Sequence, residues 1–380
     1  MKRVDIPITQ REDQDMIFNL ADDDFMQLMD NPELHLPKRW DGKDFETTLQ
    51  SLFDTYTNEL SYYCENNGNN SPYQINVNFA EIQSMCDDLI KCIREYHNGF
   101  PARAFSAMKR IMERLIETPL EIYQKTGPLG PLEEDRLYLY RTRAVNSGAT
   151  FKRENIFHVP TSARSMISTC RYSIAGYPSL YLSTSIDLAL EETSANPAQV
   201  IVSRFKLDRA QPEINIQVLE LGIKPQDFSP TGLQRENNLR LFGEHGQQSR
   251  SSLDLGQSYV RSTYLRWYPL IAACSFIRAN KSAPFASEYI IPQLLMQWIR
   301  TQCKRNHLVG LRYFSCASAR ASDMGFDYVF PVSNGKCEGG YCSVLRDSFS
   351  LTEPVYLRDY KELWQCEEEL LHLPLDKIKS

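Results

Sequence analysis

The chain has 380 residues, of which 42% are hydrophobic and 24% are charged. This composition is typical of globular proteins and excludes a largely disordered or fibrous chain. At typical domain sizes of roughly 100 to 200 residues, the length predicts two or three domains. The formal net charge of -6 at pH 7 gives no general attraction for phosphate backbones or anionic lipid. We therefore expect neither nucleic acid nor a membrane as a default partner.

The N-terminal sequence predicts a helical domain over residues 1–125. Up to about residue 64, apolar side chains recur at helical intervals, and the same spacing returns in 78–96. In 102–118 the apolar residues fall on one helix face. The intervening segment 65–74 is rich in Gly, Asn and Pro and is interpreted as a loop.

A linker is predicted at 126–135, which holds two Pro and two Gly. Beyond it, short runs rich in β-branched and aromatic residues predict strands, and helical spacing returns at 185–194 and 288–305. The polar stretch 229–258 has no sustained periodicity and is interpreted as a long loop or insertion. The predicted strands are 137–144, 179–184, 199–207, 214–221, 309–315 and 327–332.

These elements predict an α+β fold. The N-terminal α-helical domain is followed by a mixed or antiparallel sheet domain with flanking helices over 136–345, and then by a C-terminal extension, 346–380. The first residues carry charge without the apolar core of a secretory signal. The most apolar stretch, 268–277, is about half the length of a bilayer-spanning helix and is interpreted as buried core.

The ten cysteines are scattered without a CxxC pair, which is the usage of a reducing compartment. A cytoplasmic location is therefore expected. Cys337 and Cys342 lie close together, but two further ligands at a recognisable spacing are missing from the nearby sequence. We therefore expect no metal.

Familiar nucleotide-binding, metalloprotease and serine-hydrolase motifs are absent from the sequence. The densest polar cluster amid strand-like sequence is RYSIAGYPSLYLSTSIDLALEET, 171–193, which joins Arg171, Tyr181, Glu191 and Glu192. Taken alone this run is weak evidence for a site, because a glutamate on a helix surface is usually only solvated.

The run resembles the central motif of the RES domain, a family named for an arginine, a glutamate and a serine. Two further segments follow the order of that family. LYLYRTRA supplies an aromatic-arginine pair, Tyr140 and Arg141, and GLRYFS supplies Ser315. The resemblance covers roughly 136–345.

The resemblance implies an ADP-ribosyltransferase-like fold that binds NAD as its substrate and cleaves the bond between nicotinamide and ribose. Arg171 matches the motif arginine, Tyr181 the aromatic residue, and Glu192 the glutamate, with Glu191 as the reserve candidate. The sequence departs from the family where Tyr-Ser follows Arg171 in place of Trp-Asn. The 229–258 insertion and the preceding helical domain are further departures, which leave the acceptor and the regulation open.

The implied chemistry suits these residue types. Guanidinium groups such as Arg141 and Arg171 bind a pyrophosphate while keeping their charge. The Glu192 carboxylate stabilises the cation that remains on the ribose. The expected catalytic residues are Glu192, Arg171 and Ser315, and the expected NAD-binding residues are Arg141, Tyr140, Tyr172 and Tyr181.

Two other functions stay open at this point: transfer of ADP-ribose to a protein or nucleic acid, and a non-catalytic interaction module. The helical domain weakly resembles the HEPN domains that precede some RES domains. In such an RNase an Arg and a His lie four to six residues apart, whereas two residues separate Arg94 from His97. Because an uncontrolled NAD-degrading toxin is harmful, the resemblance also implies an antitoxin or inhibition by residues 1–125. A second copy of the chain, in a homo-oligomer, is a further candidate partner.

Overall fold

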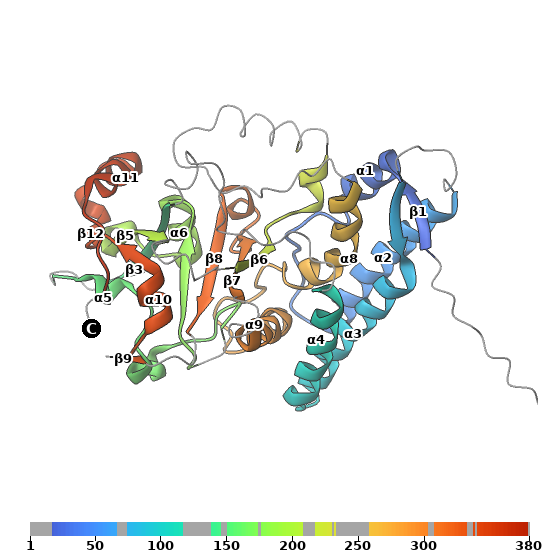
Figure 1. The fold of residues 1–380 in the computed structure, drawn as a ribbon, viewed down its shortest axis with the longest axis horizontal. Coiled ribbons are helices and arrows are strands. Elements are labelled where there is room, and N and C mark those ends of the chain that lie inside the picture. The colour runs from blue at the N-terminus through green and yellow to red at the C-terminus, as the bar shows by residue number, and fades with distance from the viewer. Residues whose placement is uncertain are drawn as a thin grey trace, which may run out of the picture.

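A sheet of eight strands and two groups of helices form an α+β fold, as the sequence predicts. The computed structural model describes residues 17–66, 74–116, 138–145, 150–173, 176–207, 217–229, 232, 258–302, 308–332, 337–338 and 340–378. In Figure 1, α1 to α4 and α8 gather at one end of the molecule, α11 lies at the other, and the large sheet lies between them.

The N-terminal helices begin and end close to the predicted positions. A side-chain cap starts α3, where Asn78 accepts a hydrogen bond from the backbone of Glu81 at 3.0 Å. The next helix, α4, has Pro101 in its first turn, where the missing N–H costs nothing. The helices are α1 (Asp22–Asp30), α2 (Phe45–Asn66), α3 (Phe79–His97) and α4 (Pro101–Leu115).

Two short strands interrupt the segments that were predicted to be helix or loop. β1 (Ile17–Ala21) pairs antiparallel with β2 (Gln74–Asn78). The expectation of helix across Phe18 and Leu20 is therefore wrong. Strands this short give a periodicity signal too weak to compete with the helical pattern that follows them, and the pairing partner lies more than fifty residues away.

A helix not assigned from the sequence, α8 (Ser258–Ala273), packs with the N-terminal group. It is buried on nearly all sides from Val260 onward, so it lacks the polar face that would reveal helical periodicity. Its C-terminal half belongs to the stretch expected to be buried, and that expectation is confirmed. The predicted helix at 288–305 forms α9 (Ile290–Gln302), with Pro292 in its first turn, where the missing N–H is tolerated.

All six predicted strands are present in the large sheet. Its order is β11-β5-β3-β4-β8-β7-β6, with β12 also paired to β5. The neighbouring pairs are antiparallel except β6 and β7, which are parallel. The strands are β3 (Tyr138–Ala144), β4 (Ser179–Ser183), β5 (Val200–Leu207), β6 (Gln217–Leu221), β7 (Leu308–Phe314), β8 (Phe326–Pro331), β11 (Phe349–Leu351) and β12 (Val355–Tyr356).

The sheet is weakly joined at its centre. Within the described residues β3 and β4 pair at one position, Tyr140 with Ser183, whereas β3 pairs with β5 along its whole length. The chain leaves β4 at this junction and enters α6 (Ile186–Thr193). The junction therefore places the predicted glutamates beside the middle of the sheet.

Segments after residue 345 complete the edge of the sheet next to β5, through β11 and β12. The buried Arg204 of β5 fixes the last helix by donating from Nε to the carbonyl oxygen of Leu370 at 2.8 Å. The smaller elements are α5 (Arg153–Ile156), β9 (Cys337–Glu338), β10 (Tyr341–Cys342), α10 (Ser343–Ser348) and α11 (Leu363–His372), with single 3-10 turns at Thr161–Met166, Pro197–Gln199, Pro225–Phe228, Ser287–Tyr289, Ala321–Asp323 and Leu357–Asp359.

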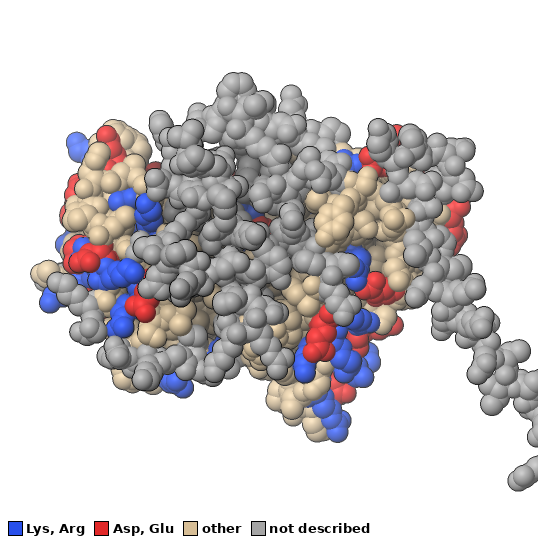
Figure 2. All heavy atoms as spheres, viewed as in Figure 1, with Lys and Arg blue, Asp and Glu red and all other residues tan. Residues whose placement is uncertain are grey.

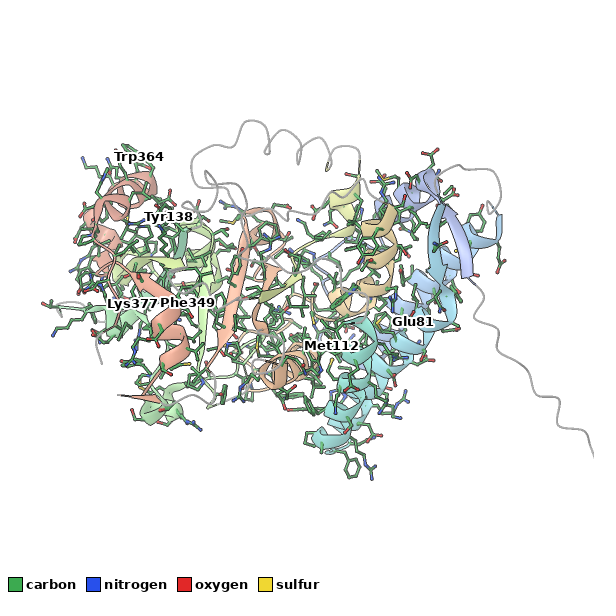
Figure 3. All side chains as sticks on the ribbon, viewed as in Figure 1. Glu81, Met112, Tyr138, Phe349, Trp364 and Lys377 are labelled. Carbon is green, nitrogen blue, oxygen red and sulfur yellow. The ribbon has the colours of Figure 1, made fainter. Side chains whose placement is uncertain are left out.

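One hydrophobic core joins the helical end to the sheet. Residues of α2, α3 and α4 pack with α8 and α9, and the same cluster continues to Leu219, Leu311 and Val329 of the sheet. In Figure 3, Met112 lies within this core, whereas Phe349 belongs to a second core at the far side of the sheet. The boundaries predicted at 125 and 345 remain predictions, because the segments on either side of them share packing.

No helix among the described residues is both long and apolar enough to cross a bilayer. The same residues contain no group of three or more potential metal ligands. The predicted linker at 126–135 and nearly all of the 229–258 insertion lie outside the described residues.

The burial of His158 leads us to predict that the folded protein loses stability when the pH is lowered. Its fully buried ring accepts a hydrogen bond at Nε2 from the backbone N–H of Cys342 at 2.9 Å and donates from Nδ1 to the carbonyl of Val159. Burial lowers the pKa of His158 to about 4 from 6.5. The unfolded chain therefore binds this proton more tightly than the folded chain does. As a result, the free energy of unfolding decreases as the pH falls from 6.5 toward 4, by about 3 kcal/mol in total.

Urea unfolding of the wild type and of His158→Gln at pH 7, 5.5 and 4.5 measures this loss. We expect the variant to be less stable at pH 7 but to lose less stability on acidification. Parallel curves for the two proteins would contradict the assignment of the acid-sensitive step to His158.

Candidate functional site

The last turn of α6 brings two glutamates to the loop that follows β7. Ser185 caps the helix, its Oγ accepting a hydrogen bond from the backbone N–H of Leu188 at 3.2 Å. This start fixes the rotation of the helix, so that Glu191 and Glu192 lie near its C-terminal end. Glu192 is exposed to solvent and Glu191 is half-buried.

Each glutamate binds a different serine of this loop. The fully buried Ser315 donates its hydroxyl hydrogen bond to Oε1 of Glu192 and itself accepts from the backbone N–H of Ala317 at 3.1 Å. Ser318 donates to Oε1 of Glu191 at 2.8 Å. The structure therefore brings Glu192 and Ser315 together as predicted, and Glu191 contacts the same loop a few residues further on.

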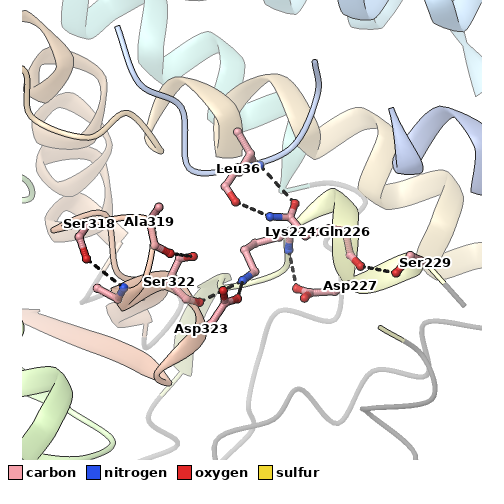
Figure 4. Close-up of polar contacts among 10 residues, drawn as sticks. Leu36, Lys224, Gln226, Asp227, Ser229, Ser318, Ala319, Ser322 and Asp323 are labelled. Carbon is pink, nitrogen blue, oxygen red and sulfur yellow. Dashed lines mark hydrogen bonds and ion pairs between the residues drawn. The ribbon is translucent and has the colours of Figure 1, made fainter. Parts of the chain in front are cut away.

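A buried lysine supports this loop from the other side (Figure 4). Lys224 donates from Nζ to the carbonyl of Ser322 at 3.0 Å and pairs with Asp323 at 2.5 Å. Ser318 also accepts from the backbone N–H of Ala321 at 3.1 Å. Because these bonds hold both ends of the loop, the two serines are presented to α6 in a fixed geometry.

The support continues into the N-terminal part of the chain. Gln226, two residues after the lysine, accepts from the backbone N–H of Leu36 at 3.2 Å and donates from Nε2 to the carbonyl of the same residue (Figure 4). Hydrogen bonds therefore connect the segment between α1 and α2 to the loop that binds the glutamates.

Arg171 lies close to this pair, but its guanidinium is anchored to the protein. It is 9% exposed, and it donates to the carbonyls of Cys274 at 3.1 Å and Phe276 at 2.7 Å, just beyond the end of α8. Burial alone lowers the pKa of Arg171, but the ionisable groups around it, among them Glu192, outweigh burial and raise it. Arg171 therefore supplies a fixed positive charge near Glu192.

Arg141 is held differently. It is half-buried, and its buried Nη1 atom has no hydrogen-bond partner among the residues that the structure describes. Burial and then the charge of Arg143 lower its pKa to about 10, against the opposing influence of Cys170 and Tyr181. The group stays charged at neutral pH, and a buried charge without a partner is costly. Such a group fits an anion supplied by a ligand.

Two residues that the sequence analysis did not identify also lie in this cluster. Cys170 is half-buried and within electrostatic range of Arg141, Arg278 and Glu192. The guanidinium of Arg278 lies 5.3 Å from the ring centroid of Tyr289, which Arg171 also approaches at 5.0 Å. Arg278 lies outside the three motif segments, so nothing in the local sequence marks it.

Of the predicted aromatic residues, the structure brings one to the cluster. Tyr181 is half-buried, exchanges a 2.7 Å hydrogen bond with Ser173, and lies near Arg141. Tyr172 is 1% exposed and packs on Tyr313, with ring centroids 4.7 Å apart, so neither of its faces is free for a ring of a ligand.

Tyr140 also lies away from the cluster. As a strand neighbour of Arg141 it points to the opposite face of the sheet, where it is 7% exposed and packs with Val202, Cys366 and Leu370. The expectation that Tyr140 and Tyr172 contact NAD therefore finds no support in their positions. The sequence shows which side chains are aromatic but not which are buried by distant segments.

The helical part gives no support for an RNase site at Arg94 and His97. Arg94 pairs with Glu46 of α2 at 2.7 Å, and His97 exchanges a 3.2 Å hydrogen bond with Ser287. On the face drawn in Figure 2, basic and acidic side chains are interspersed over the described surface of these helices. Arg94 therefore belongs to a charged, solvated helix face.

Comparison with known proteins gives one relationship. The chain is 26% identical over 341 residues to the Bacillus subtilis (strain 168) protein named "Putative toxin YopC", covering 88% of this chain and 70% of that protein. No family model matches the chain, and no solved structure matches it. The chain is thus similar over most of its length to a bacterial protein with a toxin name, and the RES resemblance remains a prediction from the motifs.

Because Nη1 of Arg141 has no partner among the described residues, we predict that binding of an anion stabilises the folded protein. Inorganic pyrophosphate at one hundred times its dissociation constant is expected to raise the free energy of unfolding by about 3 kcal/mol. Arg141→Met removes the buried charge, so its stability without ligand should equal or exceed that of the wild type, and its response to pyrophosphate should be lost. Thermal unfolding with and without pyrophosphate measures both effects.

The matched control is Arg358→Met, since Arg358 is 41% exposed and lies beside Asp359 on the surface. This variant should respond to pyrophosphate like the wild type. An equal response from Arg141→Met would show that the anion binds elsewhere.

Proposed function

We propose that this chain is an enzyme that consumes NAD by breaking the bond between nicotinamide and ribose. The observation that carries the proposal is the proximity of Arg141, Arg171, Glu192 and Ser315, which come from three separate segments of the sequence. Motif letters alone do not require these side chains to meet. Their proximity supports a site for an anionic dinucleotide, because the Arg171 guanidinium is fixed and Nη1 of Arg141 has no partner among the described residues.

In the proposed reaction the carbon-nitrogen bond of the nicotinamide riboside breaks, and its electron pair neutralises the pyridinium nitrogen. The positive charge then lies on the ribose ring, where the Glu192 carboxylate stabilises it. Water or phosphate attacks the anomeric carbon and loses a proton. Ser315 orients Glu192, Arg141 binds the pyrophosphate, and Arg171 supports the local charge balance.

We further propose that this activity makes the protein a toxin that acts inside a bacterial cell, with an antitoxin or another regulatory protein as its partner. The support is the similarity to the protein named as a toxin together with the proposed reaction, which would drain a central cofactor. The two hydrogen bonds between Gln226 and Leu36 support an influence of the N-terminal part on the site.

Glu192→Gln is expected to abolish nicotinamide release, by at least about 100-fold, because an amide cannot balance the ribosyl cation. Glu191→Gln is the matched control. Its amide oxygen still accepts the hydrogen bond from Ser318, so the loss should be less than about threefold. Purified proteins are incubated with NAD, and nicotinamide is measured by chromatography while circular dichroism checks folding.

The same assay separates the possible acceptors. Free ADP-ribose indicates water, ADP-ribose 1″-phosphate indicates phosphate, and label retained on protein or RNA indicates transfer to a macromolecule. Absence of nicotinamide under all these conditions would reject the enzyme proposal and favour a binding module.

Expression in a bacterial host tests the toxin proposal. Induction of the wild type should stop growth while cellular NAD falls, and Glu192→Gln should relieve both effects. Growth arrest by the Gln variant at equal protein level and unchanged NAD would show that toxicity has another cause.

A further inference from the structure

A second carboxyl group lies behind Glu192. Asp327 occupies the central strand β8, where it faces Ser183 of β4 on one side and Tyr313 of β7 on the other. It is 2% exposed. Aspartate is disfavoured inside strands, and a buried carboxyl group is costly without partners. Asp327 goes against both tendencies at the centre of a sheet, so its presence there requires a specific structural reason.

The contacts of Asp327 supply that cause. Its Oδ1 atom accepts the hydroxyl hydrogen bond of Ser183 at 2.5 Å. Its carboxyl group also lies within hydrogen-bond reach of the carboxyl group of Glu192. The buried Oδ2 atom has no conventional donor among the described residues. One oxygen is therefore satisfied by a serine, and the other is left to interact with a second acid.

Two carboxylates in contact cannot both be ionised without a large repulsion, so such a pair holds one proton between them. Burial, and then the negative charge of Glu192, raise the pKa of Asp327 well above its usual range. Glu192 is exposed to solvent, whereas Asp327 is buried. The proton therefore resides on Asp327, at the oxygen that lacks a donor.

The neighbouring ionisable groups fit this arrangement. Burial raises the pKa of Tyr313 on β7, and it raises that of Cys316 to about 11, so both are neutral at neutral pH. Arg171 provides a positive charge near the pair, and Cys170, with a pKa raised by burial, stays neutral. The other charged groups of the cluster are cations: Arg141 and Arg278 lie near Cys170, and Lys224 lies near Cys316.

We propose that Asp327 is the positioning residue for Glu192, a buried carboxylic acid that donates a hydrogen bond to the Glu192 carboxylate and, with Ser315, fixes its orientation. The structure shows the hydrogen bonds from Ser183 to Asp327 and from Ser315 to Glu192, and the proposed hydrogen bond from Asp327 to Glu192 joins them. The inference rests on the proposed function for its effect on NAD cleavage. The shared proton does not depend on that reaction.

The first experiment compares two substitutions in the nicotinamide-release assay. Asp327→Asn keeps an acceptor for Ser183 and a donor for Glu192, so it should retain kcat within about threefold of the wild type. Asp327→Ala removes the donor, and kcat should fall roughly 10- to 100-fold, the loss expected for one hydrogen bond to a charged group. KM should change little in either variant, because the buried side chain does not touch the substrate.

The pH profile separates positioning from a merely structural role. In the wild type, activity should decline at high pH when the pair loses its shared proton and the two carboxylates repel. Asp327→Asn cannot lose that proton, so this alkaline decline should disappear. An inactive but folded Asn variant, an unchanged alkaline decline, or an Ala variant as active as the wild type would each overturn the proposal. Asp359→Asn, a change of a surface carboxyl group, is the matched control.

The second experiment needs no activity. The infrared spectrum of the folded wild type at neutral pH should contain a protonated-carboxyl band that is missing from Asp327→Asn and present in Asp359→Asn. If the band is the same in all three proteins, the shared proton is rejected even when NAD is cleaved. If the band behaves as expected but nicotinamide is never released, the carboxyl pair stands and the proposed reaction fails.

Discussion

The arrangement of the site depends on the hydrogen bond from Ser315 to Glu192, which joins residues 123 positions apart in the chain. It connects the end of α6, a helix that contacts both β3 and β4, to the loop after β7. An exposed carboxylate alone would sample many orientations. Its attachment to a buried hydroxyl, on a loop that is itself bound to a buried lysine, gives it one orientation.

The helical part of the chain contributes to the same geometry. It shares a hydrophobic core with the sheet through α8 and α9, and the carbonyls just after α8 hold the Arg171 guanidinium. A change in the packing of these helices would therefore shift the Arg171 guanidinium, which interacts electrostatically with Glu192. This physical connection explains how a helical region without a catalytic motif of its own can matter to the site.

Charge is distributed unequally across the cluster. Arg171 is satisfied by backbone carbonyls, whereas Arg141 keeps a buried nitrogen without a partner in the described chain. The acidic side has a similar division, because Glu192 is exposed and Asp327 is buried. The protein therefore fixes Arg171 and Asp327 and leaves Arg141 and Glu192 available to a ligand. A preorganised binding site requires this combination of supporting and ligand-binding groups.

The local elements follow from the spacing of apolar residues: it predicts all six of the expected strands in the large sheet, most helices of the N-terminal part, and the α+β class. The sequence also identified Arg141, Arg171, Glu192 and Ser315 as candidates. The burial of Tyr140 and Tyr172, the place of Arg278 in the cluster, and the position of Asp327 behind Glu192 could be seen only in the folded chain. The reason is physical: periodicity reports which face of an element is apolar, whereas a side chain's partners depend on which distant strands and helices the fold places beside it.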